Sequence, residues 1–135
     1  WETFDQLDAY RHYRPLAEFL GEVPFLVKSL EPILLQTEPT GCRVLAWKGS
    51  DCFYGWIVNS QSTWHRAVVE KQEPEPVLED RLPLSGLPEG TYAVGWWDPW
   101  EGDWLRRETA HLGGARMELK IPEFARDIAL RIAPR

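Results

Sequence analysis

The chain has 135 residues, of which 44% are hydrophobic and 13% aromatic, and this is enough to bury the core of one domain. Its formal net charge of −6 argues against nucleic-acid partners, because affinity for nucleic acids comes largely from Lys and Arg that replace phosphate counterions. No apolar run approaches the roughly 20 residues of a membrane-spanning helix, and the sequence does not open with a basic leader and an apolar stretch. We therefore expect no membrane partner and no signal peptide within it.

Residues 1–38 have the pattern of a helical segment. The apolar side chains that fall at i, i+3, i+4 and i+7 are Leu16, Phe19, Leu20 and Val23. Asp5 is a candidate N-cap, Pro15 fits the first turn of a second helix, and Gly21 fits the end of that helix. We expect two short helices, followed by a strongly apolar stretch over 25–35 and a turn at 38–41.

The hydrophobic period changes to two after residue 41, which is typical of strands. Turn-forming residues separate the runs. The expected strands are residues 42–48, 52–58, 64–70, 79–84, 91–97, 103–109, 115–121 and 126–132. The sequence thus predicts a mainly β fold over residues 39–135, an antiparallel two-sheet β-sandwich of the immunoglobulin-like or jelly-roll-like kind, with residues 1–38 as a helical segment before it.

Alternation along these strands indicates which side chains form the core. The candidates that share parity are Leu82, Leu84, Tyr92, Val94, Trp96, Met117, Leu119, Ile121, Ile128, Leu130 and Ile132. Trp97 lies across the pleat from Trp96, so it belongs to the second face of its sheet. That face either meets solvent or is covered by another element.

The two cysteines are expected to be free, buried thiols. A hairpin about Gly49 would set Cys52 opposite Trp47 and Cys42 opposite Ile57, whereas a disulfide needs Cα atoms within about 7 Å. These cysteines and three scattered histidines also lack the spacing of a metal site. We expect no metal and no cofactor.

Residues 90–105 contain four tryptophans separated by acidic residues. Flat indole rings can cover the apolar faces of pyranose sugars, and carboxylates can accept hydrogen bonds from sugar hydroxyls. The candidate carbohydrate-binding residues are Trp97, Trp100, Trp104, Asp98, Glu101 and Asp103. Three stacking contacts at about 2 kcal/mol each, set against an association cost of about 4 kcal/mol, predict affinity near the millimolar range. The competing interpretation is that these indoles cover the second sheet face or contact another domain.

Catalysis by this segment is not expected. Glycosidases use two carboxyl groups on different sides of the scissile bond, but Glu101 and Asp103 lie two residues apart on one turn and would approach a sugar from one side. Ser62 and His65 lack a nucleophile elbow and a placed acid. The sequence therefore predicts a chain that is not itself an enzyme.

The segments LPLSGLPEGTYAVGWWDPWEGDWL and MELKIPEFARDIALRIAPR resemble the C-terminal β-sandwich, of the collagen-binding or carbohydrate-binding type, of bacterial glycoside hydrolases with a cellulase-like (β/α)₈ barrel. The opening WETFDQLDAYRHYRPLAEFL is similar to the last helix of such a barrel. The resemblance implies that the catalytic carboxylates lie upstream, on the barrel loops. It also implies an extracellular or periplasmic protein.

Together these observations predict a non-catalytic accessory domain of a glycoside hydrolase that binds polysaccharide or oligosaccharide weakly. The alternative is a purely structural domain that packs on the catalytic barrel and stabilises it without binding sugar. The apolar helical segment motivates this alternative, because it requires a partner surface.

Overall fold

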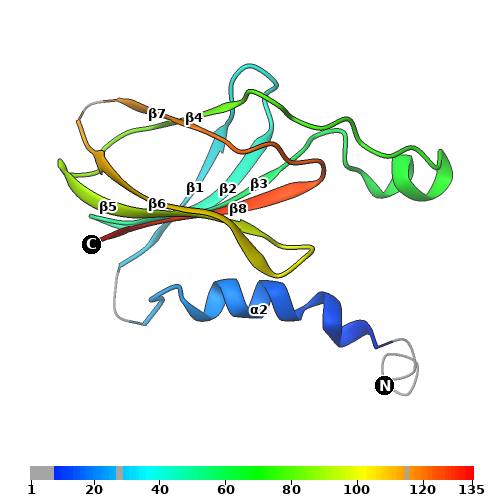
Figure 1. The fold of residues 1–135 in the computed structure, drawn as a ribbon, viewed down its shortest axis with the longest axis horizontal. Helices are drawn as coiled ribbons and strands as arrows, with labels where there is room; N and C mark the ends of the chain where they lie inside the picture. Colours follow the sequence, from blue (N-terminus) through cyan, green and yellow to red (C-terminus); the bar gives the residue numbers. More distant parts are fainter. Residues whose placement is uncertain (1–7, 27–28, 115) are drawn as a thin grey trace.

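The computed structural model describes residues 8–26, 29–114 and 116–135, and these residues form eight antiparallel strands and a short N-terminal helical layer. The strands make a six-stranded sheet in the order β1-β2-β3-β8-β5-β6 and a two-stranded sheet of β4 and β7 (Figure 1). Their bounds are Glu31–Gln36 (β1), Arg43–Lys48 (β2), Phe53–Val58 (β3), Arg81–Leu84 (β4), Gly90–Asp98 (β5), Asp103–Leu112 (β6), Met117–Lys120 (β7) and Asp127–Pro134 (β8). The predicted mainly β, two-sheet class is confirmed.

The main core lies between one face of the six-stranded sheet and the β4–β7 pair (Figure 1). The core side chains expected from strand alternation are buried there, except Met117 and Leu119 of β7, which are half-buried. Trp96 is fully buried among them, as predicted. The alternation therefore indicates the inner face correctly on β4, β5 and β8.

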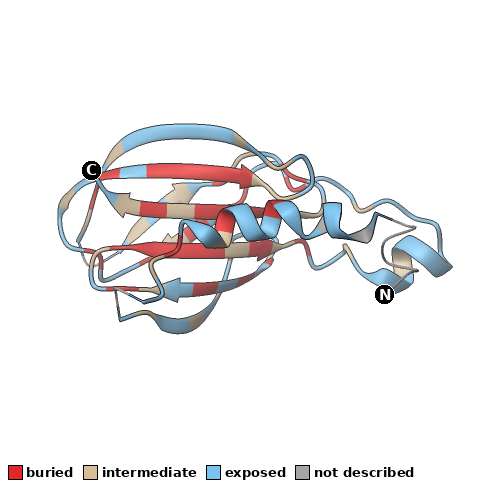
Figure 2. Ribbon diagram, turned by 90° about the horizontal axis from the view of Figure 1, so that it is seen from below, coloured by how far each residue is buried: buried red, intermediate tan, exposed pale blue. Residues whose placement is uncertain are grey.

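A helical layer covers the middle of the other face of the six-stranded sheet. It consists of the 3₁₀ turn η1 (Ala9–His12) and the helix α2 (Arg14–Gly21), which lies over the sheet and runs roughly along the strands in Figure 2. Pro15 lies in the first turn of α2 and Gly21 ends it, as predicted. Phe19 and Val23 are buried against the sheet. The candidate N-cap Asp5 lies outside the described residues. Among the residues that the structure describes, the helices are too short to span a membrane.

The prediction of a helical segment as far as residue 38 is wrong for residues 31–36, which form β1. This strand pairs with β2, with Leu34 opposite Leu45. It is the edge of the sheet, and an edge strand tolerates Pro32, which has no N–H to donate. Ile33 and Leu35 contact the main core while Leu34 points outward. Because all three residues are apolar, the alternation of inward and outward positions cannot be seen in the sequence.

The strand predicted at residues 64–70 is also absent. Residues His65–Val69 instead form a single helical turn, η2, which projects from one end of the sandwich (Figure 1). The Thr63 hydroxyl accepts a hydrogen bond from the Arg66 backbone N–H at 3.2 Å, which stabilises the start of a helical turn. Trp64 and Val68 are exposed.

The hairpin of β2 and β3 has a register shifted by two residues from the predicted one, because Trp47 lies opposite Tyr54 rather than Cys52. An even shift keeps every side chain on its predicted face. Both cysteines are free and buried, as expected. Cys42 belongs to the main core, whereas Cys52 lies in the cluster beneath Val23 on the helical side of the sheet.

Asp80 is a buried carboxylate that ties the β1–β2 turn to the start of β4. It accepts hydrogen bonds from the hydroxyls of Thr37 and Thr40 and, at 3.2 Å, from the backbone N–H of Thr40. A buried charge is tolerated when several donors satisfy its oxygens. These hydrogen bonds hold the C-terminal end of the edge strand β1 against the start of β4.

Candidate functional site

Trp97 and Trp104, two of the tryptophans predicted to bind carbohydrate, are largely covered by other side chains. Trp97 is only 6% exposed and lies beneath α2 in a cluster with Phe19 and Ala129. Trp104 packs edge-on against Trp97, with ring centroids 5.2 Å apart, and the Arg107 guanidinium lies 4.5 Å from its ring centroid. These indoles belong to the contact between helix and sheet, and Trp97 offers almost no ring surface to a ligand.

Gly95 makes this arrangement sterically possible. A Cβ atom at position 95 would lie 2.4 Å from Cζ3 of Trp104 and 2.9 Å from its Cε3. Real Cβ atoms do not approach other atoms so closely, so the indole could not lie in this position over a residue with a side chain. Gly95 therefore allows Trp104 to lie close to the backbone of β5.

Trp100 differs from the other tryptophans of this segment because it is 55% exposed. Its position is nevertheless fixed from three sides. Its backbone N–H donates to Asp98 Oδ1 at 2.8 Å, and its indole N–H donates to Asp127 Oδ1. The Arg126 guanidinium lies 4.5 Å from the ring centroid. A large apolar ring is thus held rigidly at the surface.

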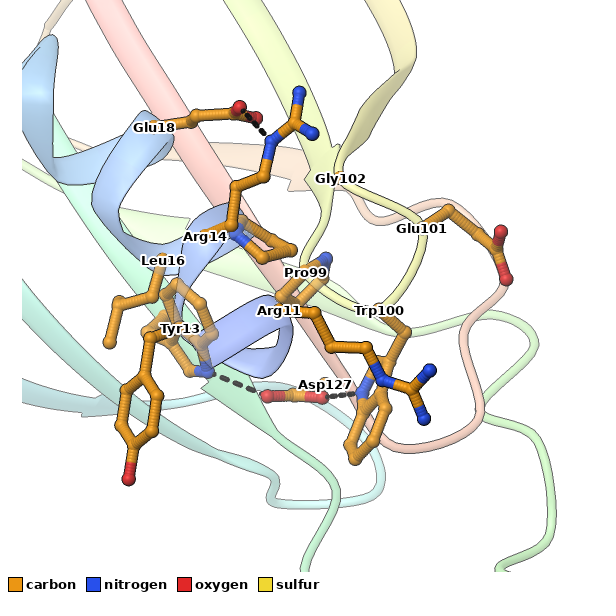
Figure 3. Close-up of a pocket in the computed structure, with 12 residues that line it drawn as sticks. Arg11, Tyr13, Arg14, Leu16, Glu18, Pro99, Trp100, Glu101, Gly102 and Asp127 are labelled. Atoms are coloured by element: carbon orange, nitrogen blue, oxygen red, sulfur yellow. Dashed lines mark hydrogen bonds and ion pairs between the residues drawn. The ribbon is translucent and has the colours of Figure 1, made fainter. Parts of the chain in front are cut away.

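A cleft of about 680 Å³ opens beside Trp100, between the helical layer and the β5–β6 turn (Figure 3). We call it the helix–turn cleft. The helical layer contributes Arg11, Tyr13, Arg14, Pro15, Leu16 and Glu18, and the sheet contributes Trp56, Pro99, Trp100, Glu101, Gly102 and Asp127. In Figure 3, Tyr13 and Trp100 lie on opposite sides of the Asp127 carboxylate.

Asp127, the first residue of β8, joins two indoles across the cleft. One carboxylate oxygen accepts the N–H of Trp100, and the other accepts the N–H of Trp56 at 2.8 Å. Both oxygens are therefore committed to holding aromatic side chains in place. Trp56 is in turn packed edge-on by Phe19 of α2, with ring centroids 5.8 Å apart.

The three acidic residues predicted to bind carbohydrate serve different purposes. Asp98 Oδ1 accepts the backbone N–H groups of Trp100 and Glu101, which holds the β5–β6 turn in shape. Asp103 accepts the backbone N–H of Trp104 at 2.7 Å and does not line the helix–turn cleft. Glu101 does line it, and its carboxylate has no hydrogen-bond or ion-pair partner among the described residues.

The remaining charges of the cleft are largely paired. Arg14 Nε lies 2.7 Å from Glu18 Oε1, and this hydrogen bond raises the pKa of the Arg14 guanidinium above its ordinary value, so it stays charged. Across the described residues, no group of three His, Cys, Asp or Glu side chains is arranged to hold a metal ion. The arrangement is suited to holding a molecule by stacking and hydrogen bonding.

Sequence reasoning selected Trp100 and Glu101 but missed Tyr13, Trp56 and Asp127. These three residues come from the helical layer, β3 and β8, segments far apart in the sequence. A local motif carries no information about such a meeting. The sequence held a signal for Trp56 alone, which forms a second aromatic set with Tyr54 and Trp64.

No family model matches the sequence, and no curated protein matches it. Among solved structures, a chain described as a glycoside hydrolase is similar, with 12% identity, a TM-score of 0.50, and coverage of 89% of this chain and 24% of that chain. A glycoside hydrolase family 5 protein from Bacteroides vulgatus ATCC 8482 is also similar, with 12% identity, a TM-score of 0.52, and coverage of 93% and 24%. This chain therefore shares its fold with part of these proteins and spans about a quarter of their length.

Proposed function

We propose that this chain is a non-catalytic accessory domain of a larger glycoside-hydrolase-like protein and that it packs against the catalytic domain of that protein. Two observations support the proposal. The similar solved chains are glycoside hydrolases of about four times this length. The sheet also has an apolar surface that the helical layer leaves uncovered. An extracellular or periplasmic location forms part of the proposal.

The uncovered surface lies on the outer face of β1 and β2 and on the segment that follows α2. We call it the β1–β2 patch, and its residues are Phe25, Leu34, Leu45 and Trp47, all exposed. Leu34 and Leu45 are direct cross-strand neighbours, and the rings of Phe25 and Trp47 meet edge-on at 5.1 Å. Contiguous apolar surface of this kind marks interaction sites on proteins.

Burying the exposed part of these four side chains on a partner is worth about 1 kcal/mol each. A domain joined to its partner by the chain does not lose the full translational freedom of a bimolecular encounter. About 4 kcal/mol of burial is therefore enough to hold two linked domains together. Trp47 and Phe25 add aromatic area, which interfaces favour.

The test is a double substitution, Leu34→Lys with Leu45→Glu, which places opposite charges on these cross-strand neighbours and is made both in the full-length parent protein and in this 135-residue chain alone. We expect the melting temperature to fall by several degrees in the parent and by about one degree or less in the isolated chain, where both positions face water. The control is Leu78→Lys, since Leu78 is equally exposed but lies outside the patch. Equal shifts in both proteins, or none in the parent, would refute the docking role.

A second function, weak carbohydrate binding, is favoured by one observation, the rigid and exposed Trp100 beside the helix–turn cleft. Because Trp97 is buried and Trp104 is half-buried between Trp97 and the Arg107 guanidinium, the predicted row of three indoles reduces to one stacking ring worth about 2 kcal/mol. This does not cover an association cost of about 4 kcal/mol, so hydrogen bonds from the cleft and repeated sites along a polymer must supply the rest. We expect millimolar affinity for oligosaccharides, measurable by isothermal titration, and its loss in Trp100→Ala.

A further inference from the structure

We infer that the helix–turn cleft accepts neutral pyranose sugars, stacked on the one indole face of Trp100 that Arg126 leaves open, and that it rejects acidic sugars. The inference rests on the second function proposed above and names the class of ligand for that site.

The first step concerns the two faces of Trp100. Its ring separates the helix–turn cleft from a second hollow of about 580 Å³ on the β8 side. Arg126 lines only the second hollow, and its guanidinium covers the ring from there at 4.5 Å. A ligand that stacks on the indole must therefore do so from the helix–turn cleft.

The second step concerns what holds the ring in place. Arg126 is itself tied to Glu73, with Nη2 at 3.1 Å from Oε2, and Asp127 holds the indole N–H. A ring with a fixed orientation loses little conformational freedom when a sugar stacks on it. Asp127 is thus a positioning residue for Trp100.

The third step concerns charge. The lining contains two arginines and three carboxylates, so its formal charge is −1. Arg14 is paired with Glu18, and Arg11 also has an interaction partner. Within the part of the cleft that the structure describes, a sugar carboxylate or sulfate would therefore meet arginines that already have partners, and it would face the Glu101 carboxylate, which has none among the described residues.

The same Glu101 carboxylate suits a neutral sugar. Pyranose hydroxyls donate hydrogen bonds, and an ionised carboxylate accepts stronger hydrogen bonds than a neutral group does. Tyr13 lines the cleft from the helical layer, and its phenolic hydroxyl can both donate and accept hydrogen bonds. Stacking on Trp100 with hydroxyl contacts to these two residues matches an uncharged ring.

The experiment is affinity gel electrophoresis of the 135-residue chain in gels containing neutral polymers (β-glucan, glucomannan and xylan) or acidic polymers (polygalacturonate and alginate). We expect retardation by at least one neutral polymer and by neither acidic polymer. Trp100→Ala should reduce the retardation at least tenfold, and Asp127→Asn, which removes one acceptor oxygen, should reduce it three- to tenfold. Trp64→Ala is the matched control, because Trp64 is a more exposed tryptophan outside the cleft, and it should leave retardation unchanged.

The outcomes separate the two levels of the proposal. Retardation by no polymer at all would overturn the carbohydrate-binding function, and the inference with it. Retardation by an acidic polymer as strong as by a neutral one would overturn the inference alone. Undiminished retardation of Trp100→Ala by a neutral polymer would also overturn the inference alone. Glu101→Gln provides the check on charge, since it should weaken binding of the neutral polymer only a few-fold and relax the exclusion of acidic polymers.

Discussion

Replacing Phe19 by alanine tests whether α2 covers the outer face of the sheet. Phe19 is 5% exposed, packs edge-on against Trp56 and shares a cluster with Trp97 and Ala129. Deleting a buried phenylalanine side chain costs 3–5 kcal/mol, according to the transfer and cavity terms. We expect about 3 kcal/mol, the lower end, because one side of the helix faces solvent and the site can partly collapse. For a domain of this size, the loss lowers the melting temperature by about 10 °C.

The assay combines urea unfolding with acrylamide quenching of tryptophan fluorescence. Phe19→Ala should lower the free energy of unfolding and increase quenching, because loosening α2 uncovers Trp97 and Trp56. The control is Leu16→Ala on the same helix, at an exposed position, which should cost less than 1 kcal/mol. If Phe19→Ala costs no more than Leu16→Ala and quenching is unchanged, α2 does not cover this face, and the argument for burial of Trp97 fails.

Three further predictions concern other parts of the fold. Asp80→Ala should destabilise the protein by about 3 kcal/mol in urea unfolding, because it leaves buried hydroxyl and amide donors without their acceptor; a cost below 1 kcal/mol would contradict the proposed network. Burial, the largest cause, raises the pKa of Tyr54 from 10.0 to about 12. Below pH 10 the phenol is neutral in both the folded and the unfolded chain, so its full contribution to the stability of the fold is present. As the pH rises from 10 to about 12, the unfolded chain ionises first, and roughly 2–3 kcal/mol of the free energy of unfolding is lost. Tyr54→Phe should flatten that decline in unfolding measured at a series of pH values, and an unchanged slope would count against the burial of the phenol. Gly95→Ala should displace the Trp104 indole and cost about 1–3 kcal/mol, and this cost should largely vanish in a Trp104→Ala background.

The two proposed functions use different surfaces of the molecule. The β1–β2 patch lies on the edge of the sheet, whereas the helix–turn cleft lies between α2 and the β5–β6 turn. A domain docked through the patch does not need to cover Trp100. We therefore expect that substitutions can remove either proposed function without removing the other.

Strand alternation and turn residues were enough to predict most of the sandwich. They failed at β1 and η2, where short apolar runs are compatible with more than one structure. At β1 the pairing with β2 decided the outcome, and at η2 a local hydrogen bond from Arg66 to Thr63 favoured a helical turn. The candidate site was predicted only in part, because Tyr13, Trp56 and Asp127 reach the cleft from three distant segments.

The sequence by itself determined that Trp96 is buried, that Trp97 lies on the opposite face of β5, and that Pro15 and Gly21 bound a helix. These follow from the two-residue period of a strand and from backbone constraints that act within a few residues. Only the tertiary structure decided that Trp97 is covered and Trp100 is exposed. A strand's period says to which face a side chain points, but whether that face meets water depends on a helix that lies about 80 residues earlier in the chain and packs across it.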